Sequence, residues 1–261
     1  AVLDPDMSYR LKEEIVIENL KIYEGRKILE ISENNVVLPE ETIPFDNLFV
    51  CAGLKPNIEL AKASGLEVGK GIVVNECMQT SDKEIYACGD CVESAEFYSQ
   101  QKMLSQLGTT AVRQAKVIAE NITGGKTGFP EVLNNTITKL GDFFVASVGL
   151  TETRANELGI KTVSAKYSGP LRAEYYTSEG SVCVKLICDL KGIIIGGQIL
   201  GSAEVVGRIN LISLAIQKRC SALDLMRMDT CYNPASAPIS DPVSITAEIC
   251  LKKLNFLKDV K

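Results

Sequence analysis

Histidine and tryptophan are absent from this sequence of 261 residues, and the missing histidine excludes the most chemistry. Without an imidazole, the chain by itself cannot form a Ser-His or Cys-His catalytic pair or an imidazole metal site. A block of basic residues is also missing, and the formal net charge is −5. We therefore expect neither nucleic acid nor an anionic membrane surface as a partner.

Long hydrophobic runs are missing too. The longest, at 48–52 and 143–146, are far shorter than the roughly 20 residues that a membrane-spanning helix needs. The beginning of the sequence carries no basic and then apolar secretory leader. The 9 cysteines are odd in number and several lie in apolar runs, which indicates reduced, largely buried thiols instead of a disulfide framework. We expect a cytoplasmic protein.

The glycine-rich loop G-x-G-x-x-G, which holds dinucleotide phosphates between a strand and a helix, does not occur either. The glycines between 196 and 207 have the wrong spacing, and we interpret them as allowing a strand and a helix to pack closely. If the protein holds a dinucleotide, its main phosphate loop lies outside this sequence. The opening, an expected helix from Asp4-Pro5 to about Asn19 with no strand before it, favours a piece of a longer chain.

The most informative stretch that is present runs from Thr80 to Cys91, TSDKEIYACGDC. We expect a strand at 84–88 that ends on Gly89-Asp90. A carboxylate at the carboxyl end of a sheet strand lies where open α/β folds bind ligands. Asp90 could accept two sugar hydroxyls there and orient a nucleotide without taking part in chemistry. The alternative is an ordinary turn aspartate.

The same stretch contains a C-x-x-C pattern, Cys88-Gly-Asp-Cys91. In a thioredoxin-like protein such a pair stands at a helix N-terminus, where the helix dipole lowers the pKa of one thiol, whereas here it follows an expected strand. One pair is also half of a zinc site. A protein that uses Cys88 and Cys91 for thiol redox chemistry or for metal binding is therefore one hypothesis. Activity and metal content unchanged by Cys91→Ser would exclude it.

The first half of the sequence has an α/β pattern. Strands are expected at 48–52 and 71–75, with a short helix at 57–64 near the first. Apolar residues from Met103 to Ile122 recur at helical spacing over five turns. The stretch 128–130, which contains glycine and proline, is the best candidate linker.

The second half has an antiparallel α+β pattern. We expect strands at 137–140, 143–148, 161–166, 181–188 and 193–200, and helices at 204–218 and 245–257. Between these helices, Tyr232 lies in a proline-rich segment that could place its phenol in a neighbouring site. The alternative is a tyrosine packed under a loop.

Two stretches resemble one family. Phe45-Asp46 through Pro56-Asn57, and then 71–75 with Thr80 to Asp90, are similar to the C-terminal part of flavin-dependent pyridine nucleotide-disulfide oxidoreductases. The resemblance covers essentially the whole sequence. It implies an α/β protein with remnants of two Rossmann-like nucleotide-binding domains followed by an α+β antiparallel-sheet dimerisation domain. The implied boundaries are 1–53 for the end of the NAD(P)H-binding domain, 54–127 for the second segment of the FAD-binding domain and 133–261 for the dimerisation domain.

The resemblance also implies site residues. The aspartate that matches Asp90 holds the ribityl chain of FAD, and Gly53, Thr80 and Gly89 count as further cofactor-binding residues. The helix that matches 103–122 points its N-terminus at the flavin ring, where its dipole favours the reduced, anionic form. Met103 and Leu104 would then lie beneath the ring.

In the tail, the spacing from Asp229 through Tyr232 and Pro234 to Asp241-Pro242 resembles the coenzyme A-disulfide reductase and NADH oxidase branch. There a tyrosine reaches the active site of the partner subunit, so Tyr232 is the candidate catalytic residue. Ala235-Ser236 replaces the usual proline and aromatic residue, which predicts a different substrate pocket. The missing histidine argues against the glutathione- and lipoamide-type branch, and none of the cysteines matches the redox position of the family.

Two hypotheses of different classes follow. In the first, the chain is the C-terminal part of a homodimeric flavoenzyme that passes hydride from NAD(P)H to FAD and then to a small-molecule acceptor, namely a disulfide, a persulfide or oxygen. In the second, it is a non-catalytic dimerisation or assembly module that lacks a complete flavin site. The second predicts a stable dimer without bound flavin and without NAD(P)H oxidation.

Overall fold

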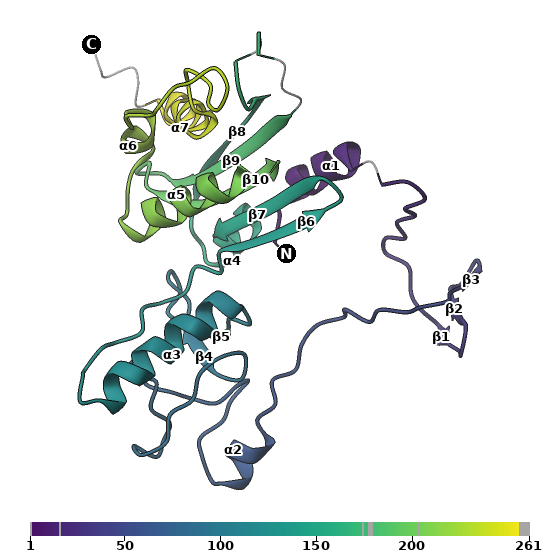
Figure 1. The fold of residues 1–261 in the computed structure, drawn as a ribbon, viewed down its shortest axis with the longest axis vertical. Helices are drawn as coiled ribbons and strands as arrows, with labels where there is room; N and C mark the ends of the chain where they lie inside the picture. The colour runs from purple at the N-terminus through teal and green to yellow at the C-terminus, as the bar shows by residue number, and fades with distance from the viewer. Residues whose placement is uncertain (1, 16, 174, 177–179, 203, 256–261) are drawn as a thin grey trace. The chain divides into compact units, whose positions relative to one another are not determined.

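A computed structural model of the chain describes residues 2–15, 17–173, 175–176, 180–202 and 204–255. The described chain forms two compact units (Figure 1). The larger unit takes in Ala1–Ile15 and Pro56–Lys261, and the smaller unit is Val16–Lys55. No helix in the described part of the chain is both long enough and apolar enough to cross a membrane.

The smaller unit is a short antiparallel sheet in the order β1-β2-β3. Its strands are β1 (Glu30–Ile31), β2 (Asn35–Val37) and β3 (Thr42–Pro44). The strand expected at 48–52 does not form, and Phe49 is 86% exposed. A strand of this apolar kind needs neighbours that pair with its backbone and cover both faces, and the described residues provide no such neighbour.

The first part of the larger unit is built on little regular structure. Its elements are α1 (Pro5–Glu14), α2 (Glu59–Ala63), β4 (Glu93–Ala95), β5 (Lys102–Leu104) and α3 (Gly108–Ile122). The strands expected at 71–75 and 84–88 are reduced to isolated bridges, Ile72 with Val92 and Gln79 with Tyr86. A small apolar cluster replaces the expected sheet core, formed by Ala61, Ile72, Val74, Met78, Val92 and Val117.

Two expected helices have different bounds. The helix expected from Met103 begins at Gly108, because Leu107 has extended backbone angles (φ −124°, ψ 131°) and Met103 pairs with Ser94 in the β4–β5 ladder. The spacing of the apolar residues 103 and 107 fits both a helix and a hairpin, so the spacing alone could not tell which of the two structures would form. The opening helix ends at Glu14 instead of Asn19, because Ile15 has already turned to extended angles.

The second part of the larger unit is a five-stranded antiparallel sheet in the order β6-β7-β10-β9-β8. The strands are β6 (Thr136–Leu140), β7 (Phe143–Gly149), β8 (Thr162–Pro170), β9 (Ser181–Asp189) and β10 (Ile194–Gly201). The helices are α4 (Glu152–Glu157), α5 (Val205–Gln217), α6 (Ala222–Met226) and α7 (Pro242–Lys253). The expected antiparallel α+β module is thus confirmed. The sequence missed the short α6 and placed the start of α7 three residues late, and residues 256–257 of that expected helix lie outside the described residues.

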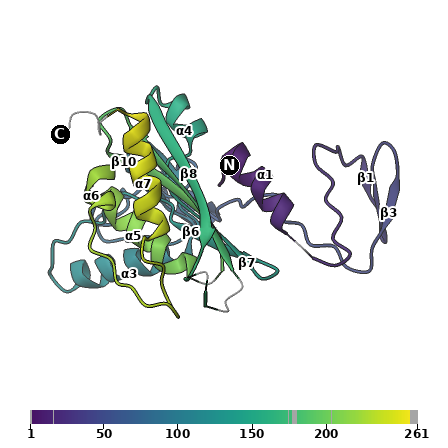
Figure 2. The same cartoon turned by 90° about the horizontal axis from the view of Figure 1, so that it is seen from above.

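The two faces of this sheet are covered by different helices (Figures 1 and 2). Helices α5, α6 and α7 cover one face, where the alternate residues Val184 and Leu186 of β9 are buried in the main core. Helix α1 lies on the other face, where Met7 contacts Cys183 and Leu200. The period-2 alternation of β9 therefore gives its even-numbered residues to one layer of helices and its odd-numbered residues to the other.

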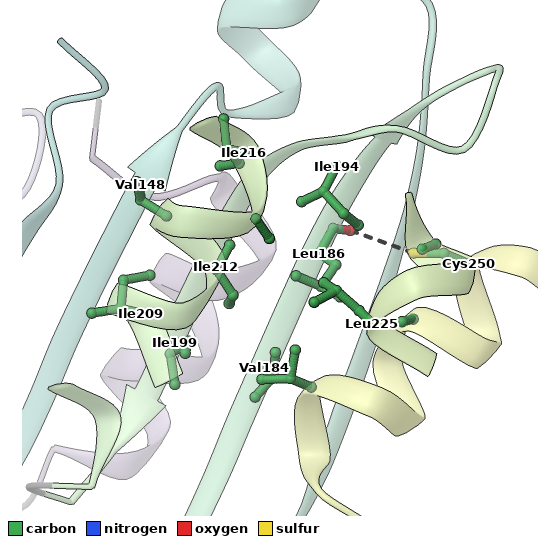
Figure 3. Packing of buried hydrophobic residues seen from close by; sticks show 14 of the residues in the cluster. Val148, Val184, Leu186, Ile194, Ile199, Ile209, Ile212, Ile216, Leu225 and Cys250 are labelled. Atoms are coloured by element: carbon green, nitrogen blue, oxygen red, sulfur yellow. Dashed lines mark hydrogen bonds between the residues drawn. The ribbon is translucent and has the colours of Figure 1, made fainter. Parts of the chain in front are cut away.

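Glycines let α5 and the loop before α4 approach β10. Ile209, Ile212 and Ile216 of α5 point at the sheet (Figure 3). A Cβ at Gly197 would lie 2.8 Å from Ile212 Cγ2, and one at Gly196 would lie 1.9 Å from the Leu150 carbonyl oxygen. The packing interpretation of these glycines holds for both. It fails for Gly207, around which there is open space.

Candidate cofactor and active-site residues

The turn that carries Asp90 is fixed to helix α3 by one buried side chain. Gln114 accepts a hydrogen bond from the amide of Gly89 (2.7 Å) and donates one to Ser94 Oγ (2.9 Å). Only 1% of Gln114 is exposed. Gly89 itself has φ +89°, a conformation that side-chain-bearing residues rarely adopt. The backbone before Asp90 is therefore held in one place by α3 and by the geometry of glycine.

The Asp90 carboxylate itself is exposed and has no hydrogen-bond partner among the described residues. Asp90 is the second residue of a turn closed by a hydrogen bond from the Val92 amide to the Gly89 carbonyl (3.2 Å). An exposed carboxylate on a rigid turn can accept two hydroxyl groups from a ligand. The sheet edge at which we expected Asp90 is absent. Helix α3 instead holds the turn that contains Asp90 in place.

The N-terminus of α3 lies beside a groove of about 800 Å³. Leu107 at the N-cap position provides no side-chain hydrogen bond, so the first amides of the helix are left for other acceptors. The helix dipole makes this end of the groove electropositive. The groove is mostly apolar, and its wall includes Val2, Leu3, Leu107, Gly108, Thr109, Ile137, Leu140 and Val145. The groove therefore combines apolar walls with one electropositive end.

Met103 and Leu104 precede α3 and are not part of it. Both lie in β5, where Met103 Sδ accepts a hydrogen bond from Asn134 Nδ2 (3.6 Å) and Leu104 lies against Gly71. Because α3 begins only at Gly108, the residues at its N-terminus are Gly108 and Thr109. The expected helix start at Met103 is therefore wrong, whereas the expected place of Met103 and Leu104 beneath a flavin ring stays a prediction.

Thr80 and Gly53 differ in their surroundings. The Thr80 hydroxyl donates to the Asp82 carbonyl (2.9 Å) and accepts from the Asp82 amide (3.2 Å), so it shapes the loop that leads to Asp90. Gly53 has φ +115° and nothing within 4 Å of an added Cβ. It belongs to the smaller unit.

Tyr232 forms a phenol pair with Tyr175, their hydroxyl oxygens 2.9 Å apart. The exposed fractions are 45% for Tyr232 and 75% for Tyr175, so Tyr232 is not packed under its loop. The hydrogen bond from Tyr175 raises the pKa of Tyr232. Sequence reasoning missed Tyr175, which lies 57 residues away in a stretch without a recognisable pattern.

The Tyr232 loop is tied down at its far end. Asp241 accepts from the Val243 amide (2.8 Å), which caps α7, and pairs with Arg208 of α5 (3.0 Å). Asn233 closes the near end by accepting from the Ala235 amide (2.9 Å). The aspartate and asparagine of the motif therefore hold the loop, and the tyrosine is presented to solvent.

The C-x-x-C pair shows none of the features of a reactive dithiol. Cys91 Sγ donates to the Cys88 carbonyl (3.5 Å), and burial raises the pKa of Cys91, which favours the unreactive thiol. All nine cysteines are free, and three of them, at 183, 188 and 250, are buried. Within the described chain, the cluster of side chains close enough to share a metal ion consists of Asp4, Asp6 and Glu152, without a cysteine.

Together, the rigid carboxylate turn, the open helix N-terminus and the antiparallel sheet define an α/β segment with a candidate ligand site, followed by an antiparallel α+β module. Two sequence models agree: that of the pyridine nucleotide-disulphide oxidoreductases matches residues 1–115, and that of their dimerisation domain matches 137–240. The chain belongs to the pyridine nucleotide-disulphide oxidoreductase family.

Particular relatives narrow this further. An NADH oxidase of Methanocaldococcus jannaschii is 38% identical over 97% of this chain and 58% of its own length. A CoA-dependent NAD(P)H sulfur oxidoreductase of Pyrococcus furiosus is 30% identical over 88% of this chain and 53% of its own length. The structure of an NAD-dependent persulfide reductase from A. fulgidus matches 98% of this chain and 49% of its own, with 34% identity and a TM-score of 0.91. The chain thus spans about half the length of these relatives.

Proposed function

We propose that this chain is the C-terminal part of an FAD-dependent NAD(P)H oxidoreductase. The observation that carries the proposal is the exposed Asp90 carboxylate on a turn clamped to α3 by Gln114. Relatives named NADH oxidase and NAD(P)H sulfur oxidoreductase support it. The proposed boundaries are 1–53 for the end of the NAD(P)H-binding domain, 54–127 for the FAD segment and 133–261 for the dimerisation domain.

The residues that would hold FAD are on α3 and on the turn packed against it. Asp90 would accept the ribityl hydroxyls, and the amides of Gly108 and Thr109 would face the electron-rich edge of the ring system. Thr80 would act indirectly by holding the loop before Asp90. Gly53 would lie where the chain leaves the NAD(P)H-binding domain and enters the FAD segment. When bound, FAD would accept hydride from NAD(P)H and deliver electrons to a disulfide, a persulfide or oxygen.

Tyr232 is the proposed proton donor, and Tyr175 is proposed to orient it. A phenol whose pKa is raised by its neighbour stays protonated near neutral pH and can hydrogen-bond to a developing thiolate or oxyanion. Its exposed position on a tied loop is consistent with action in the site of a second subunit. We accordingly propose a homodimer in the cytoplasm that uses a small-molecule acceptor.

The alternative is a non-catalytic dimerisation module. Both functions predict a dimer, so the deciding property is bound flavin. We expect the purified natural protein to be yellow, with flavin absorbance that is lost on denaturation and extraction. A colourless protein that does not take up added FAD would overturn the proposal and favour the module.

Substitution of Asp90 tests the proposed anchor. We expect Asp90→Ala to raise the Kd for FAD at least about tenfold, since a charge-assisted hydrogen bond contributes roughly 1.5–3 kcal/mol. Titration of the flavin-free protein with FAD measures the Kd. Glu84→Ala is the control, because Glu84 is an exposed carboxylate of the same stretch, and an equal rise in Kd in both variants would contradict a specific role of Asp90.

A further inference from the structure

A lysine is buried in the dimerisation sheet and paired with three carboxylates. Lys185 of β9 is 2% exposed, and its Nζ lies 3.1 Å from Asp4 Oδ2 and 2.7 Å from Asp6 Oδ1. Glu152, the first residue of α4, provides the third carboxylate. Two of the three partners therefore come from the start of α1, nearly 180 residues away in sequence.

The Asp4 carboxylate occupies a socket of donors. Besides Lys185, Oδ2 accepts from Gln198 Nε2 (2.7 Å), and the amides of Glu152 and Thr153 at the start of α4 donate to the two oxygens (3.2 and 3.4 Å). Asp4 also donates its own amide to Gln198 Oε1 (2.9 Å). Asp4 and Gln198 are each 1% exposed. The start of α1 is thus held by groups on β9, β10 and α4.

The charges of this cluster depend on one another. The three carboxylates are close enough to hold a metal ion, but the ammonium group of Lys185 already lies among them. Burial would lower the pKa of Lys185, yet the hydrogen bonds to Asp6 and Glu152 outweigh it and the pKa is raised. Removing the ammonium would leave a buried carboxylate without its counter-charge, which is strongly unfavourable.

An apolar contact adds to the ionic one. Met7 is fully buried against Val145, Cys183 and Leu200 on the same face of the sheet. A helix of ten residues is too short to be stable by itself in water. Helix α1 therefore forms because the sheet holds it, and among the described residues Lys185 is the side chain that pairs with both of its N-terminal aspartates.

We propose that Lys185 is a positioning residue: it keeps α1 docked on the dimerisation sheet, so that Val16–Lys55 is attached at both of its ends. The chain passes from α1 into this smaller unit and returns to the larger unit at Pro56. With α1 docked, both connections start from fixed points. If α1 were released, only the connection at Pro56 would start from a fixed point, and the smaller unit would gain conformational freedom.

The enzymatic consequence rests on the proposed function. Residues 1–53 are there assigned to the end of the NAD(P)H-binding domain. Two fixed connections would lower the conformational freedom of the part of that domain at 16–53. Loss of Lys185 would then weaken the productive binding of NAD(P)H more than it slows the chemical step.

The test uses the natural protein with Lys185→Met, which keeps the length of the side chain and removes its charge. We expect amide hydrogen exchange in α1 to rise at least about tenfold, with unchanged protection in β9 and β10. The KM for NADH should rise about fivefold or more while kcat and flavin content change less than twofold. Lys166→Met is the control, because Lys166 pairs with Asp6 from an exposed position (3.3 Å).

A second variant covers the case in which Lys185→Met does not fold. Asp4→Asn should also increase exchange in α1, and the double variant should be no worse than the more damaging single one, because both remove one interaction. Unchanged α1 protection in a folded variant would overturn the docking role of Lys185. Lost protection with an unchanged KM would overturn its positioning role. A natural protein without flavin would instead refute the proposed function, since the exchange result does not depend on it.

Discussion

At the scale of single residues, the site depends on contacts that join distant parts of the sequence. Asp90 and Tyr232 are candidates that the sequence alone can name, because each stands in a local motif with characteristic spacing. Gln114 and Tyr175 could not, because their partners Gly89 and Tyr232 lie 25 and 57 residues away. A glutamine in an amphipathic helix gives no local sign that it will be buried.

The tyrosine pair yields a prediction for the proposed reaction. We expect Tyr232→Phe to lower turnover about a hundredfold, the usual lower bound for losing a general acid. Tyr175→Phe should keep more activity and move the alkaline limb of the pH–rate profile to lower pH, because it removes the hydrogen bond that raises the pKa of Tyr232. An alkaline limb that does not move would show that Tyr175 leaves the titration of Tyr232 unchanged.

The glycines of β10 and α5 offer a matched pair. Gly196→Ala would put a methyl group 1.9 Å from the Leu150 carbonyl oxygen, and we expect it to lower the free energy of unfolding by about 1–3 kcal/mol. Gly207→Ala, in the open part of α5, should raise it by up to about 1 kcal/mol, as alanine favours a helix. Denaturant titration measures both, and equal effects would disprove the packing argument.

At the scale of elements, an expected strand formed where the chain provides a neighbouring strand that can hydrogen-bond to its backbone. The strands of the antiparallel sheet were predicted within a few residues, because each finds its neighbour within the same module and alternates its side chains. The strands expected at 48–52, 71–75 and 84–88 read as equally apolar, but they lack partner strands in the described chain. A run of apolar residues indicates that a segment is buried. The segment forms a strand only if another strand lies beside it and pairs with its backbone N–H and C=O groups.

Helix α1 gives a pH prediction. Burial would raise the pKa of Asp6, but its hydrogen bond and charge interaction with Lys185 prevail and the pKa is lowered. Asp6 therefore stabilises the docked helix at pH values above its ordinary pKa of 3.8 and loses this effect as the pH falls through its lower folded value. The raised pKa of Lys185 has the opposite sign, and its contribution disappears only as the pH rises above 10.5.

Hydrogen exchange or NMR of the α1 amides against pH measures this. We expect α1 protection to be greatest between these limits and to weaken on acidification below about pH 4. Asp6→Asn is the control and should flatten the acid limb. A protein whose α1 protection does not change between pH 3 and pH 7 would show that the carboxylate contributes nothing to docking.

At the scale of the whole molecule, the chain combines a segment that matches the pyridine nucleotide-disulphide oxidoreductases with one that matches their dimerisation domain. The dimerisation-domain match at 137–240 leads us to expect a particle of twice the chain mass. Sedimentation equilibrium measures this mass directly, and a monomer at micromolar concentration would contradict the proposed homodimer. Strand β9 makes two kinds of contact. Its even-numbered residues pack in the main core, and its odd-numbered residues hold α1.

The division of the chain into units has a consequence for how this protein can change over time. The smaller unit leaves the larger one after Ile15 and returns at Pro56. None of the described hydrophobic clusters takes a residue from 16–55. A substitution in this segment therefore replaces no side chain of those clusters. The packing of the larger unit thus constrains the evolution of this segment less than it constrains β9 or α5.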